Sequence, residues 1–164
     1  MRDNKKIALR AILLAGVLII GAIERLIPFE FAVPGVKLGL SNAVLLVALY
    51  ILTFWDALLI TVLKCCLNLI ITGSAGAFIF SLCGSLLALF GMSALIKTAK
   101  NKLSPVGISA AGAVLHNSGQ LLAASALTGR TEVFYYLPVL LVSGVLTGIL
   151  TGYAAKYVLN ILKK

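Results

Sequence analysis

Acidic residues are scarce in this chain, with five Asp and Glu among 164 residues against fourteen Lys and Arg. Charged residues of both signs make up 12% of the sequence, whereas a soluble domain carries roughly a quarter. Hydrophobic residues make up 61%, and the mean hydropathy is +1.10. This composition excludes a soluble globular domain. It predicts an all-α integral membrane protein that forms a single domain over residues 1–164.

The chain also lacks the common motifs of catalysis. It has no G-x-x-x-x-G-K-[ST] phosphate loop, no H-E-x-x-H zinc motif and no G-x-S-x-G nucleophile motif. Its acids are too scattered to form the paired carboxylates that hold a diphosphate through magnesium. These absences give no argument for catalysis without excluding it, and no cofactor is expected. The five acids are Asp3, Glu24, Glu30, Asp56 and Glu132.

Cysteine and basic residues exclude two further classes of site. Cys65, Cys66 and Cys83 lie in apolar runs without a C-x-x-C spacing or a nearby histidine, which predicts neither a disulfide nor a metal site. The net charge of +9 comes from residues at the ends of apolar runs rather than from one patch, so no nucleic-acid partner is expected. We expect the apolar runs to contact the surrounding membrane lipid.

Six apolar runs predict six membrane helices, because a bilayer core of ~30 Å takes about 20 helical residues. Basic residues lie mostly at one side of these spans, with three at the other: Arg25, Lys37 and Arg130. The positive-inside bias therefore predicts that both termini are cytoplasmic. The predicted spans cover about 5–27, 37–53, 55–72, 75–98, 105–128 and 132–162. The basic residues of the richer side are Arg2, Lys5, Lys6, Arg10, Lys97, Lys100, Lys102, Lys156, Lys163 and Lys164.

The fifth span has a small and polar face opposite an apolar one. Ser104 is its predicted N-cap and Pro105 its first residue. Small and polar residues on one face predict contact with other helices, whereas the opposite face is expected to contact lipid. At 100° per residue, the first face holds Ser109, Gly112, Ala113, His116, Gln120 and Ala123, with Asn117 at its edge, and the second holds Val114, Leu115, Leu121 and Leu122.

Three hydrogen-bonding side chains of this face, His116, Asn117 and Gln120, are candidates for the floor of a ligand pocket. The alternative is that they hold helices together without any ligand, since such side chains also form interhelical hydrogen bonds. The sequence of this stretch favours neither interpretation.

Lys64 lies near the centre of the third span, where a lysine costs about 3 kcal/mol. Ala57, Thr61 and Asn68 are on the same side of that helix. No acid falls at mid-depth in any predicted span, so an anionic ligand or partner is the simplest way to compensate the charge. A lysine bonded to carbonyl groups, or deprotonated by burial, is the alternative. Lys64 and Asn68 are therefore candidate ligand-binding residues.

Residues 28–42 form the longest gap between helices, because Pro28, Pro34 and Gly35 interrupt any continuous helix. Within it, Glu30 lies between two phenylalanines, a pattern that predicts a loop that dips into the interface or covers a cavity. The residues of this expected lid are Phe29, Glu30 and Phe31.

Lys37, Ser41 and Asn42 mark the expected start of the second span. A cation and an amide near a helix N-terminus suit an anionic or polar ligand. The alternative for Lys37 is a side chain that extends to the lipid headgroups. Lys37 and Asn42 join the candidate ligand-binding residues.

Small residues at intervals of four predict close helix packing. They occur as Ala11 and Ala15 in the first span and as Gly144, Gly148 and Gly152 in the last. A further stripe of small residues lies in the fourth span and comprises Ser81, Gly84, Ser85 and Ala88.

The last predicted span exceeds one bilayer width. We therefore expect an interfacial turn before Pro138, with Thr131 as its cap.

Four segments together resemble a known family of small bacterial membrane proteins. The family is called Gx transporters and is often labelled heptaprenyl diphosphate synthase component I. The resemblance covers nearly the whole chain. The segments are PGVKLGLSN (34–42), FSLCGSLLALFGM (80–92), AGAVLHNSGQLL (111–122) and YYLPVLLVSGVLTGILTG (135–152).

This family is similar in size and six-helix layout to the substrate-capturing S-components of energy-coupling factor transporters. The resemblance implies an S-component-like bundle in a bacterial cytoplasmic membrane, with an outward pocket and the first loop as its lid. Ala11 and Ala15 match the alanine motif by which S-components dock on a transmembrane coupling subunit that works with ATPases.

We therefore expect a membrane subunit that captures a small anionic or partly apolar compound for uptake, such as an isoprenoid precursor, a quinone precursor or a vitamin-like molecule. The alternative is a non-catalytic membrane subunit of a heptaprenyl or polyprenyl diphosphate synthase. A third hypothesis is a stand-alone membrane enzyme that acts on a lipid or quinone precursor.

Overall fold

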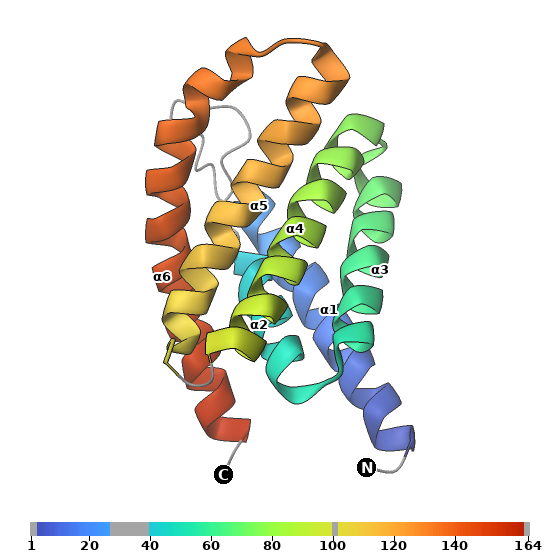
Figure 1. Cartoon of the computed structure of the whole chain (residues 1–164). Helices are drawn as coiled ribbons and strands as arrows, with labels where there is room; N and C mark the ends of the chain where they lie inside the picture. Colours follow the sequence, from blue (N-terminus) through green and yellow to red (C-terminus); the bar gives the residue numbers. More distant parts are fainter. Residues whose placement is uncertain (1–2, 27–39, 100–101, 163–164) are drawn as a thin grey trace.

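The computed structural model describes residues 3–26, 40–99 and 102–162, and within these ranges all regular structure is helical (Figure 1). This confirms the predicted all-α class. The elements are α1 (Asp3–Leu26), α2 (Leu40–Ile51), α3 (Phe54–Thr72), α4 (Ala75–Ala99), α5 (Pro105–Thr128), the 3-10 helix η1 (Glu132–Tyr136) and α6 (Leu137–Leu162).

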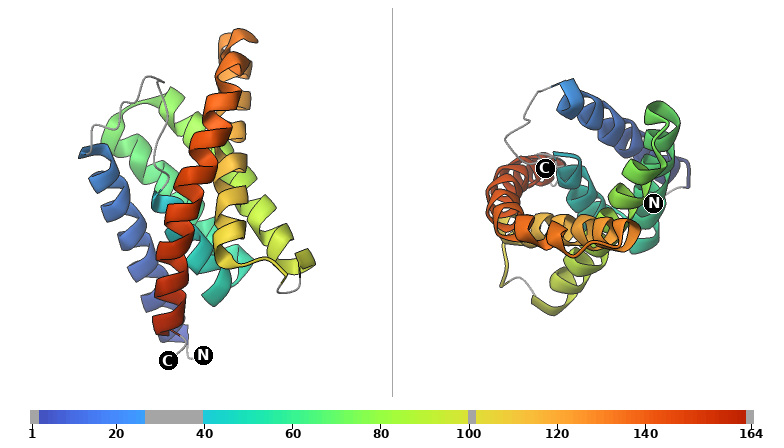
Figure 2. Two further views of the ribbon diagram at one scale, coloured as in Figure 1. Left: turned by 90° about the vertical axis from the view of Figure 1, so that its left-hand side faces the viewer. Right: turned by 90° about the horizontal axis from the view of Figure 1, so that it is seen from above.

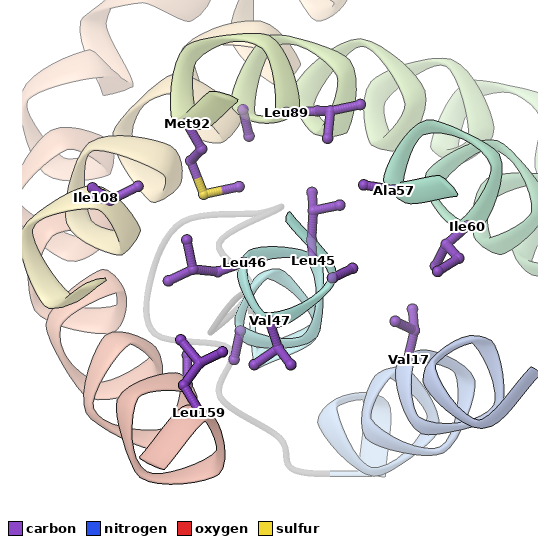
Figure 3. Close-up of a cluster of buried hydrophobic side chains, with 14 residues drawn as sticks. Val17, Leu45, Leu46, Val47, Ala57, Ile60, Leu89, Met92, Ile108 and Leu159 are labelled. Carbon is purple, nitrogen blue, oxygen red and sulfur yellow. The ribbon is translucent and has the colours of Figure 1, made fainter. Parts of the chain in front are cut away.

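Successive α-helices alternate in direction, so that α1 begins and α6 ends at the same end of the bundle (Figures 1 and 2). The short helix α2 lies in the middle and contacts each of the other five. Figure 3 shows it surrounded by the turns of α1, α3, α4, α5 and α6. Within the described part of the chain, α3 and α5 do not contact each other, and both pack against α4.

The second helix differs most from its predicted span. It has 12 residues from Leu40 and rises about 18 Å, less than the ~30 Å of a bilayer core. Residues 37–39, where the predicted span begins, lie outside the described residues. Four segments of the described chain are long and apolar enough to cross a membrane: Lys6–Ile23, Phe54–Thr72, Ala75–Ala99 and Glu132–Leu162. The polar residues of α5 lower its hydropathy, although its 24 residues would suffice in length.

The ends of several helices follow from local sequence. Ser104 is the N-cap of α5, as predicted, and its Oγ accepts a hydrogen bond from the Gly107 backbone N–H at 3.2 Å. The expected turn before Pro138 is present as η1. Thr131 takes the N-cap position of η1, as predicted, but its side chain forms no cap hydrogen bond. At the start of α3, Thr53 and Asp56 form a capping box, and Arg10 of α1 forms an ion pair with Asp56.

One apolar core fills the part of the bundle around α2 (Figure 3). Leu45 and Leu46 of α2 project toward Leu89 and Met92 of α4 and Ile108 of α5. These buried side chains hold the central helix against α4 and α5, two of the five helices that form a ring around it. The core therefore fixes the depth at which α2 begins.

Glycines bring α4, α5 and α6 into backbone contact. A Cβ at Gly148 of α6 would lie 2.5 Å from Ala110 Cα, and one at Gly119 of α5 would lie 2.9 Å from Gly84 Cα. Side chains larger than hydrogen would separate these helices. The predicted close-packing face of α6 is thus confirmed.

The two faces of α5 are only partly as predicted. Leu122 is exposed, and the small and polar residues from Ser109 to His116 are buried, in agreement with the expected lipid and protein faces. The assignment of Leu121 to the lipid face is wrong, because its side chain is only 7% exposed. Since α5 packs against both α4 and α6, neighbours cover more than one face of the helix.

Candidate functional site

The side chain of Lys64 connects α3 to the first turn of α2. Its Nζ donates a hydrogen bond to Ser41 Oγ at 3.1 Å, and the lysine is partly buried. Thr61, one turn earlier on α3, is also buried, and its hydroxyl donates to the Ala57 carbonyl at 2.7 Å. Lys64 therefore extends into the bundle, where its charge adds to the positive end of the α2 dipole.

Asn42 of α2 and Ser85 of α4 are both buried. On a helical wheel, Asn42 falls between the directions of Leu45 and Leu46, one turn nearer the start of α2. Ser85 falls one turn before Leu89 on the same side of α4. Both helices run in the same direction, and these leucines lie in one core (Figures 1 and 3). Asn42 and Ser85 consequently face the interior directly above that core.

His116 of α5 lies against α4 at Gly84. A Cβ at Gly84 would lie 2.7 Å from the His116 carbonyl oxygen and 3.0 Å from its Nδ1. Gln120, one turn further along α5, also packs here, because its Cγ would lie 2.8 Å from that Cβ. The absence of a side chain at Gly84 therefore makes room for the imidazole and for the stem of Gln120.

We call this group of residues, which closes the apolar core on one side, the polar layer. Lys64 supplies a cation, His116 a ring that can donate or accept, and the others supply hydroxyl and amide groups. Lys64 and His116 belong to helices that do not contact each other within the described chain, with α4 between them. The layer can therefore bind a molecule with separate anionic and hydrogen-bonding groups. Its members are Ser41, Asn42, Lys64, Ser85 and His116.

Asn117 faces a different neighbour. Its Nδ2 donates to the Leu140 carbonyl of α6 at 2.8 Å, and the residue is buried. The structure thus gives Asn117 the interhelical hydrogen bond that the sequence analysis weighed against a pocket role. Asn117 therefore bonds to α6, whereas His116 packs against α4.

The remaining predicted site residues fall into three places. Asn68 is partly buried on α3, one turn beyond Lys64. Ala11 and Ala15 are exposed on α1. The expected lid and the lysine before α2 lie outside the described residues: Phe29, Glu30, Phe31 and Lys37.

The sequence analysis missed Ser85 as a site residue, although it noted the small-residue stripe to which Ser85 belongs. A second residue of that stripe, Ser81, lies 3.6 Å from Cys65 through its Oγ and the cysteine Sγ. The available signal was a pair of serines, Ser81 and Ser85, one turn apart in an apolar helix. The sequence analysis interpreted them as packing residues.

The described chain is a helical membrane protein, since long apolar helices expose large aliphatic side chains around a core that contains a polar layer. The chain belongs to the heptaprenyl diphosphate synthase component I family, whose model matches residues 13–158. All members of the polar layer lie within the match. No curated protein and no solved structure matches the chain.

Proposed function

We propose that this protein is a membrane-embedded substrate-binding subunit, similar to an S-component, that captures a small anionic or partly apolar compound for uptake. The observation that carries the proposal is the hydrogen bond from Lys64 to Ser41 inside the bundle. Lys64 Nζ and the N-terminus of α2 bring positive charge to one place inside the bundle, which favours an anionic ligand there.

The depth of the polar layer supports a binding role. The ring helices α3, α4 and α5 extend beyond the start of α2, at the end of the bundle opposite the chain termini (Figure 1). A ligand held by Lys64 and Ser41 would therefore lie inside the ring rather than at its rim. We propose six membrane segments with cytoplasmic termini, so that this half of the bundle faces outward. In this arrangement the short α2 forms the floor of the site.

The first helix provides a surface for a partner. Ala11 and Ala15 are exposed, as are the aliphatic side chains of Ile12 and Ile19 on the same helix. Small residues at this spacing allow another helix to approach closely. We propose that this face docks on a transmembrane coupling subunit served by ATPases in a bacterial cytoplasmic membrane.

A second candidate function rests on the family description, which names a component of heptaprenyl diphosphate synthase. In that role the protein is a non-catalytic membrane subunit that associates with other synthase components. It would hold an anionic isoprenoid compound at the membrane. Co-purification with a soluble prenyl synthase, and a change in that enzyme's product length, would favour this function over uptake.

The test is native mass spectrometry of the protein released gently from its membrane into lipid nanodiscs. The wild type is expected to carry a small molecule, and Lys64→Ala is expected to reduce its occupancy at least tenfold. Lys156→Ala is the matched control, because Lys156 is an exposed lysine of α6. Retention of the compound by Lys64→Ala would refute substrate capture at this site, and the co-purifying subunits separate the two candidate functions.

A further inference from the structure

Two buried oxygen atoms of the polar layer have no hydrogen-bond partner among the residues that the structure describes. They are Asn42 Oδ1 and Ser85 Oγ, in side chains that are 3% and 0% exposed. A buried polar atom without a partner costs roughly 1–3 kcal/mol. A guest molecule that reaches both atoms would satisfy them together.

Ser109 shows that a buried serine of this bundle can have a hydrogen-bond partner in a neighbouring helix. Ser109 of α5 is also buried, but its Oγ lies 3.0 Å from Thr151 Oγ1 of α6. The helices thus complete the hydrogen bonding of Ser109 internally. The described residues give the Ser85 hydroxyl no such partner.

The chemistry of the two atoms limits the guest. Asn42 Oδ1 can only accept a hydrogen bond, whereas the Ser85 hydroxyl can donate or accept. A hydroxyl or N–H group satisfies Asn42 by donating to it, and a hydroxyl can at the same time accept from Ser85. The hydrocarbon part of a simple isoprenoid or fatty anion has no such group.

We propose that the substrate carries a hydrogen-bond donor, a hydroxyl or an N–H group, next to its anionic group. The anionic group lies toward Lys64 and Ser41, and the donor reaches Asn42 and Ser85. This inference rests on the proposed substrate-binding function and narrows the class of compound to hydroxylated or amino-bearing small anions. It also assigns Ser85 and Asn42 as specificity-determining residues.

The experiment compares two probes, hexanoate and 2-hydroxyhexanoate, which have the same carbon chain and charge and differ in one hydroxyl. Binding to the protein in nanodiscs is measured by calorimetric titration. The wild type is expected to bind 2-hydroxyhexanoate about tenfold more tightly, the effect of one well-placed hydrogen bond. Ser85→Ala is expected to remove this preference without weakening hexanoate. Asn42→Leu provides a second variant with the same expected result.

Ser109→Ala is the matched control, since it also removes a buried serine hydroxyl. It is expected to keep the preference but to lower the melting temperature, because it breaks the contact with Thr151. Ser85→Ala removes an atom without a partner, so its melting temperature is expected to equal or exceed that of the wild type. This difference separates a binding role of Ser85 from a structural one.

Equal binding of the two probes, or a preference that survives in both variants, overturns the inference and indicates that ordered water occupies the two oxygens. Failure of both probes to bind protein that retains its co-purified compound overturns it as well. If both probes bind equally and Lys64→Ala weakens both, substrate capture stands and only the donor requirement falls. If Lys64→Ala changes neither the probes nor the native compound, the proposed function itself falls.

Discussion

The carboxamide of Asn117 occupies the space that a side chain at position 144 would need. A Cβ at Gly144 would lie 2.9 Å from Asn117 Nδ2, which donates to the Leu140 carbonyl at 2.8 Å. The glycine and the asparagine thus form one interhelical contact, four residues along α6 from the carbonyl that accepts the bond. This pairing divides the polar face of α5 between packing against α6 and the polar layer against α4.

Asn117→Ala is expected to destabilise the protein without changing its ligand binding. Loss of an interhelical hydrogen bond in a membrane bundle costs about 0.6 kcal/mol on average and up to about 1.7. The melting temperature in detergent measures the first effect, and occupancy by the native compound measures the second. His116→Ala, at the contact of α5 with α4, is expected to reduce occupancy. If Asn117→Ala lowers occupancy as much as His116→Ala does, the division of the face is incorrect.

Gly148→Ala is expected to destabilise the bundle more than a glycine substitution elsewhere. The added Cβ would lie 2.5 Å from Ala110 Cα, so the backbones of α5 and α6 must separate. Overpacking of this kind typically costs about 1–3 kcal/mol. Gly21→Ala is the matched control on α1, since a Cβ there meets nothing within 4 Å. Equal melting temperatures for the two variants would show that the α5–α6 contact is looser than described.

The class of the helices and the approximate bounds of all but α2 could be predicted from sequence, because apolar run length and proline, glycine and serine signals act locally. Ser104 and Pro105 fixed the start of α5 in this way. The depth and central position of α2 could not be predicted. Hydropathy indicates that a helix is kept from water, but it does not indicate which helices surround it. The same reason explains the burial of Leu121, which depends on α5 having neighbours on two sides.

Part of the candidate site also required the structure. The sequence identified Lys64 by the cost of a lysine in an apolar run and Asn42 by its position near the start of a helix. The contact of Lys64 with Ser41 joins positions 23 residues apart, and no local pattern predicts it. Ser85 stayed unassigned because a serine is inexpensive in a helix. Its meaning depends on the helices around it, which leave its hydroxyl without a partner in the described chain.

The ion pair between Arg10 and Asp56 is expected to stabilise the attachment of α1 to α3. Asp56 is buried and also caps α3 with Thr53, whereas Arg10 is about one-third exposed. Arg10→Ala leaves a buried carboxylate without its cation, so the double variant Arg10→Ala/Asp56→Asn is expected to cost less than the sum of the two single variants. Melting temperatures of the two single variants and the double variant form the cycle. Strict additivity would contradict a direct coupling of the two side chains.

Both chain termini and the α4–α5 connection are expected to lie on the cytoplasmic side. Lys102, in that connection, and Arg130, beyond the end of α5, are exposed at opposite ends of the bundle. In intact cells, a membrane-impermeant maleimide is expected to label Arg130→Cys, and to label Lys102→Cys only after the membrane is opened. The wild type controls for Cys65, Cys66 and Cys83, which lie within the α3 and α4 segments and should stay unlabelled. Labelling of Lys102→Cys in intact cells, with Arg130→Cys protected, would invert the orientation and place the polar layer on the cytoplasmic side.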